Sequence, residues 1–183
     1  MDKDLFVPVM LSEHLKEVFK VCSPREKEML GALFFKCEES VKELVRQIPY
    51  PKIRRQIFLK DMDRLIEHEK ASNDNARNIT CKKGCFWCCK LPEVSVTLDE
   101  ASELRAYASR YPVQNGACRF LLGGLCEIYD ERPLSCRKYF SMDKPELCEG
   151  GVFRVIKKWI PIEAEIWWSA SATVLGTILL NDL

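Results

Sequence analysis

The residues best suited to chemistry are eight cysteines between residues 81 and 148. Four of them lie within nine residues, in the pattern C-x3-C-x2-C-C, and four more follow at wider spacing. They are Cys81, Cys85, Cys88, Cys89, Cys118, Cys126, Cys136 and Cys148. A deprotonated thiol is a soft ligand, and several thiols at short, fixed spacing suit zinc or an iron–sulfur cluster. The eight cysteines are therefore the candidate metal ligands.

The charge of this segment favours a bound cation. Residues 81–148 carry ten basic and nine acidic side chains, a formal charge of +1. If the eight thiols became thiolates, the charge would fall to −7, and self-repulsion of that size favours metal binding. The whole chain also has a net charge of +1, which gives no reason to expect nucleic acid as a partner.

Disulfide bonds are the other use that ten cysteines could serve. The first eight residues contain neither a basic region nor an apolar run of signal-peptide length. The adjacent pair Cys88 and Cys89 also fits a disulfide framework poorly, since a vicinal bridge strains the backbone. We therefore expect free thiols in a cytoplasmic protein.

Helices must position these cysteines. Ser23-Pro24-Arg25-Glu26 is a helix start, with Ser as N-cap and Glu as its reciprocal partner, and Pro49 and Pro51 end the helix that follows. Helices are predicted over 12–22, 23–48, 52–70 and 98–109, the last opened by a second capping box at Thr97. Turns at Gly116 and at Gly123-Gly124 place the later cysteines on short elements, from which thiols can converge.

The sequence thus predicts a mainly α protein, a single small domain of packed helices around an irregular cysteine-rich metal-binding centre. Residues 1–78 are its N-terminal helical part, 79–148 the metal-binding module, and 149–183 an apolar C-terminal helix that packs on the core. The uncharged run at 166–180 spans 15 residues, fewer than the roughly 20 that cross a membrane. We expect it to be a buried helix or a dimer contact, and we do not expect membrane association.

Several other residues are predicted to be structural. Cys22 and Cys37 fall within helical patterns and are expected to be small core residues. Arg54-Arg55 alternates with acidic residues, as on a solvated helix face, while Ile53 is expected on the inner face. His14 and His68 have no second ligand at metal spacing and are expected at the surface.

The first three cysteines match the cluster loop of radical S-adenosylmethionine enzymes. The roughly 95 residues that follow hold no succession of strands and helices for the barrel of such enzymes. The longer pattern, C-x3-C-x2-C-C, then C-R-F-L and C-x-I-Y-x-x-R-P-x-x-C-R, resembles the YkgJ-type CxxxCxxCC family of zinc- or iron-chelating domains over roughly residues 78–140. A related cysteine module occurs in FliB-type lysine-N-methylases. The resemblance implies a chelating role for the seven matching cysteines, and Cys148 lies beyond it.

Three functions remain open from the sequence. Seven or eight thiols exceed the four ligands of one zinc ion, which favours an iron–sulfur cluster with a redox or auxiliary role. The alternatives are a structural zinc domain that binds a protein partner, and an enzyme that modifies a protein or peptide substrate. No sequence element supplies a nucleotide-binding glycine loop or an acid–base pair, so no catalytic residue is assigned.

The neighbours of the cysteines also have expected roles. Arg119, Arg132 and Arg137 are expected either to offset thiolate charge or bind an anionic substrate, or to form surface ion pairs. The aromatic residues are expected to pack around the site and exclude water; they are Phe86, Trp87, Phe120 and Tyr129.

Overall fold

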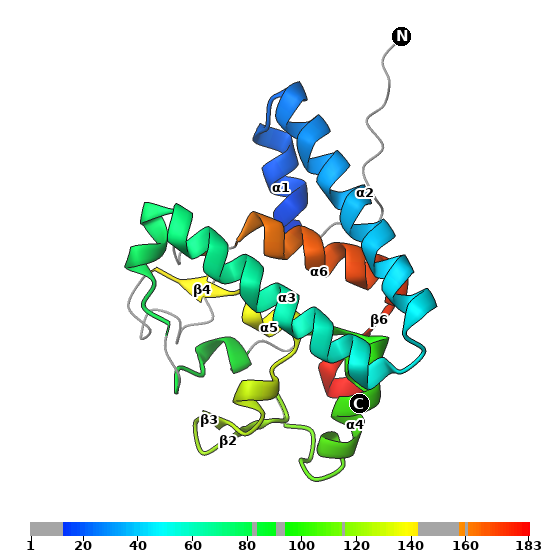
Figure 1. Ribbon diagram of the computed structural model, residues 1–183. Coiled ribbons are helices and arrows are strands. Elements are labelled where there is room, and N and C mark those ends of the chain that lie inside the picture. Colours follow the sequence, from blue (N-terminus) through cyan, green and yellow to red (C-terminus); the bar gives the residue numbers. More distant parts are fainter. Residues whose placement is uncertain (1–12, 82–83, 91–93, 115, 143–157, 160) are drawn as a thin grey trace.

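Helices make up most of the part of the chain that the structure describes. The structure is a computed structural model, and it describes residues 13–81, 84–90, 94–114, 116–142, 158–159 and 161–183 (Figure 1). The α-helices in these ranges are α1 (Glu13–Val21), α2 (Pro24–Gln47), α3 (Pro51–Ser72), α4 (Leu98–Ala108), α5 (Leu134–Arg137) and α6 (Ile162–Leu175). The 3₁₀ helices include η1 (Asp74–Asn78), η2 (Trp87–Lys90), η3 (Tyr129–Glu131) and η5 (Leu180–Asp182). The predicted mainly α fold is confirmed.

Local signals set the helix boundaries. At the start of α2, Ser23 Oγ accepts a hydrogen bond from the Glu26 N–H, and the Glu26 carboxylate accepts one from the Ser23 N–H at 2.8 Å. Pro49 and Pro51 separate α2 from α3, since proline cannot continue a helix from within. A second capping box, at Thr97, starts α4. The helices predicted over 12–22, 23–48, 52–70 and 98–109 therefore match α1, α2, α3 and α4 to within two residues.

The core between the long helices is centred on α6. Figure 1 shows this helix between the α1–α2 pair and α3, and it contacts all three. Trp167 on α6 meets Phe58 of α3 edge to face at 5.8 Å, beside the fully buried Val41 and Met62. The uncharged run at 166–180 is thus helical and largely buried only as far as Leu175, at the end of α6, and the residues after Gly176 form a short strand instead of continuing the helix. No helix in the described part of the chain is long and apolar enough to cross a membrane.

The prediction that Arg54 and Arg55 lie on a solvated face is wrong. Both are buried, and Ile53, predicted to face inward, is 45% exposed. Arg54 pairs with Asp99 of α4, and Arg55 with Glu131, each at 2.6 Å. A guanidinium can be buried when a carboxylate accepts hydrogen bonds from it, so ion pairs set the inner face at the start of α3. Further along the helix, apolar residues such as Phe58 and Met62 form that face.

Three short antiparallel sheets, each of two strands within the described ranges, tie distant parts of the chain together. They pair β1 (Ser95–Thr97) with β6 (Thr177–Leu179), β2 (Leu121–Leu122) with β3 (Leu125–Cys126), and β4 (Phe140–Ser141) with β5 (Lys158–Trp159). In the first, Val96 lies opposite Ile178, and this pairing brings the C-terminus against the cysteine region. A second buried cluster forms there, from Val96, Ala101, Leu104, Ala108, Cys118, Phe120, Ile128 and Leu180.

Candidate metal centre

Short elements and turns hold the cysteines, as predicted. Cys88 and Cys89 lie on η2, Cys126 ends β3, and Cys136 lies on α5. Gly84 and Gly116, which precede Cys85 and Cys118, have φ of +92° and +71°. That left-handed conformation strains other residues, so glycine permits the tight turn there. The Cys118 N–H donates to the Cys89 carbonyl at 2.6 Å, which joins the first group of cysteines to the second.

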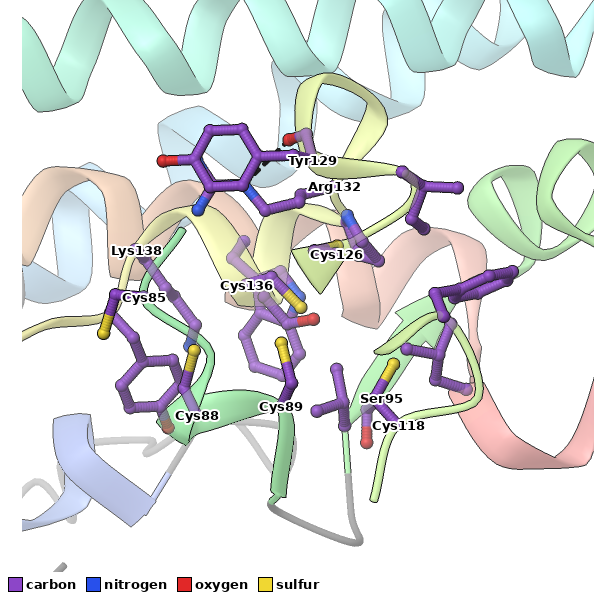
Figure 2. A pocket seen from close by; sticks show the side chains of 18 residues that line it. Cys85, Cys88, Cys89, Ser95, Cys118, Cys126, Tyr129, Arg132, Cys136 and Lys138 are labelled. Atoms are coloured by element: carbon purple, nitrogen blue, oxygen red, sulfur yellow. Dashed lines mark hydrogen bonds between the residues drawn. The ribbon is translucent and has the colours of Figure 1, made fainter. Parts of the chain in front are cut away.

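Six of the eight predicted cysteines line one cavity of about 300 Å³. They are Cys85, Cys88, Cys89, Cys118, Cys126 and Cys136. Figure 2 shows their side chains around the cavity, with those of Cys89 and Cys136 near its middle and that of Cys85 toward one end. The volume is far larger than the roughly 10–15 Å³ that holds one water molecule.

The other cysteines differ in position. Cys81 does not line this cavity, and its Sγ accepts a hydrogen bond from the Ser141 N–H at 2.9 Å. Cys148 lies outside the described residues. Cys37 is half-buried and packs against two core clusters, in agreement with its predicted core role, and Cys22 is half-buried at the end of α1. His68 is exposed, as predicted, and the side chain of His14 is not described.

A network of hydrogen-bonded thiols runs through the cavity. The Cys89 thiol bonds to both Cys88 and Cys126, and these bonds raise its own pKa. The same bonds, aided by the charge of Arg132, lower the pKa of Cys88 and that of Cys126 to about 7 each. Burial raises the pKa of Cys118 and, more strongly, that of Cys136. The lowered pKa favours the thiolate at Cys88 and Cys126, and a thiolate is the form that binds metal.

The three arginines turn out to have different roles. Arg132 lines the cavity, and its guanidinium lies 3.8 Å from the centre of the Tyr129 ring. Arg119 is buried and donates to the carbonyls of Ala108 and Tyr111. Arg137 forms an ion pair with Asp63 at 2.7 Å. Arg132 is therefore placed to offset thiolate charge at Cys88 and Cys126, and the charge of Arg119 acts in the same direction on Cys118.

Apolar and aromatic side chains complete the wall. Phe120, which is fully buried, and Tyr129 line the cavity, as predicted for residues that exclude water. Phe86 is half-buried and lies against Gly124, and the side chain of Trp87 is not described. Tyr139 and Trp168 also reach the cavity.

Lys138 also lines the cavity and is 3% exposed, although the sequence does not mark it as part of the site. Its place two residues after a candidate ligand, Cys136, is a weak signal. Its burial depends on an ion pair with Glu165. The two residues lie 27 positions apart, so no local sequence pattern indicates that they pair.

The wall fits a thiolate-bound metal in the type and number of its donors. Six lining residues are cysteines, and none of the described lining residues is histidine, aspartate or glutamate. Soft sulfur donors without oxygen ligands suit zinc or iron–sulfur centres. As the side chains stand, no three cysteine, histidine or acidic residues in the described ranges are close enough together to hold one metal ion.

The fold and the cavity define a mainly helical protein with a cysteine-lined centre. Residues 80–155, under half of the chain, match the family model CxxCxxCC, described as "Putative zinc- or iron-chelating domain". The match confirms the resemblance stated from the sequence, and it extends far enough to include Cys148. No curated protein and no solved structure matches the chain. Over this region the chain is thus similar to a cysteine-rich metal-binding domain.

Proposed function

We propose that the protein carries an iron–sulfur cluster in this cavity, bound by cysteine thiolates, with a redox or auxiliary role. The observation that carries the proposal is that six cysteines line one cavity. One tetrahedral zinc takes four ligands, so six thiols around one space favour a centre of more than one metal atom. The cavity of about 300 Å³ leaves room for such a centre.

The surroundings support an electron-transfer or auxiliary role. Arg132 lies in the cavity wall, where a cation stabilises the negative charge that thiolates bring. Tyr139, also in the wall, is 39% exposed, so the site lies near the surface and within reach of a partner. We infer that this partner is another protein or a peptide.

A structural zinc domain is the second candidate, and one observation favours it. Cys118 belongs to the buried apolar cluster beside the cavity, and Cys89 and Cys126 pack against that cluster. A metal held by these cysteines would stabilise the fold of this region directly, as structural zinc does in small domains.

Metal and acid-labile sulfide analysis of anaerobically purified protein separates the two. The proposal predicts iron with matching sulfide, together with the brown colour and charge-transfer absorption of a cluster. Stoichiometric zinc without sulfide, in protein expressed with ample iron, would reject the cluster and support the structural domain.

A further inference from the structure

A buried ion pair contributes one of its two residues, Lys138, to the wall of the cysteine cavity. Lys138, just after α5, and Glu165, on α6, are joined by a hydrogen bond of 2.5 Å, and their side chains are 4% and 0% exposed. The Lys138 ammonium also lies 4.0 Å from the centre of the Trp168 ring. Lys138 lines the cavity together with Cys136, and Figure 2 shows both among the cysteines.

Burial of these two charges costs free energy, and the hydrogen-bonding capacity of the pair is only partly used. Burial lowers the pKa of Lys138, and the charge of Glu165 opposes that change. One carboxylate oxygen of Glu165, Oε1, is buried without a hydrogen-bond partner among the described residues. Well-packed apolar residues are often as stable as a buried ion pair, so the pair is not explained by stability alone.

The chemistry of the cavity supplies a reason for a fixed cation. Metal binding converts thiols to thiolates and releases their protons, so the cavity becomes more negative when it is loaded. A cation in the wall stabilises the loaded state over the metal-free state, and a low dielectric strengthens this effect.

We propose that Lys138 is the built-in counter-cation of the cysteine cavity and that Glu165 moderates its charge, so that the two residues together set how tightly metal is held. This inference rests on the proposed function, because it needs a thiolate-bound metal. It assigns positioning and charge-tuning roles, and neither residue is a ligand.

The test uses Zn²⁺ alone as the probe. Metal-free, reduced protein competes for Zn²⁺ with a chromophoric chelator at one fixed neutral pH. K138M should bind Zn²⁺ on the order of tenfold more weakly, and K138R should return close to the original affinity. E165Q should bind more tightly, because it removes a negative charge from beside the cavity, while the charge of Cys136 continues to favour the protonated form of Lys138. Lost packing alone would weaken binding in K138M and E165Q alike, so the opposite signs identify a charge effect.

The matched control is another lysine–glutamate pair, neither member of which lines the cavity. Lys42 on α2 pairs with Glu38 at 2.7 Å and is 43% exposed, so K42M should leave the affinity unchanged. In iron-loaded protein, K138M should lower the midpoint potential and E165Q should raise it, because reduction adds negative charge.

The failure of this inference differs from failure of the proposed function. If the original protein binds no metal, both are overturned. Suppose that it binds metal but that K138M has the same Zn²⁺ affinity as K42M, or that K138M and K138R weaken binding equally. Either result rejects the role of Lys138 as counter-cation and leaves the proposed metal centre unaffected. Should E165Q fail to fold, as judged by its helical circular dichroism, the comparison of K138M with K138R decides alone.

Discussion

Replacing Cys126 by alanine should weaken metal binding roughly a hundredfold. This cysteine lines the cavity, its pKa is lowered to about 7, and it is hydrogen-bonded to Cys89. Structural zinc sites bind with about 10–16 kcal/mol over four ligands, so one thiolate contributes about 3 kcal/mol. The measurement is the metal content of purified protein after gel filtration, together with Zn²⁺ affinity by chelator competition.

Cys37 gives a matched control for this substitution. It is a half-buried cysteine on α2 that packs against the helical core and does not line the cavity. C37A should keep its full metal content while C126A loses it. Equal metal loss in the two variants, or full retention in C126A, would contradict the assignment of the cavity as the metal site.

Replacing Arg54 by alanine should lower the free energy of unfolding by about 3–5 kcal/mol. Its Nε and Nη2 donate to the two carboxylate oxygens of Asp99, each at 2.6 Å, and both side chains are buried. The substitution leaves the Asp99 carboxylate in a buried position without its cation, between α3 and α4. Urea denaturation, followed by circular dichroism, measures the change.

An exposed ion pair serves as the comparison. Arg46 lies 3.1 Å from Glu43 on the surface of α2, and R46A should cost under about 1 kcal/mol. If R54A costs no more than R46A, the buried pair does not hold α3 against α4. The double variant R54L/D99L should recover much of the loss, because it removes both charges.

Local features of the fold were predictable, and distant pairings were not. The capping boxes at Ser23 and Thr97 involve residues three positions apart, so the sequence shows them directly. Burial of Arg54 depends on Asp99, 45 residues away, and helical periodicity contains no such information. Pairing of β1 with β6 joins strands of three residues each, too short to leave an alternating pattern.

The candidate site shows the same division. Spacing and residue type identified all six cysteines that line the cavity. They could not separate Cys81 from them, because its hydrogen bond comes from Ser141, 60 residues further on. The Lys138–Glu165 pair could likewise not be predicted from the sequence, because the two residues come together only in the folded chain.

X-ray absorption at the metal edge of anaerobically purified protein is the most direct test of thiolate binding in this cavity. We predict sulfur as the nearest scatterer, near the roughly 2.3 Å of metal–thiolate bonds, with a second shell of iron if a cluster is present. Nearest neighbours that are mainly nitrogen or oxygen, at about 2.0–2.2 Å, would place the metal on histidine or carboxylate ligands and contradict the account.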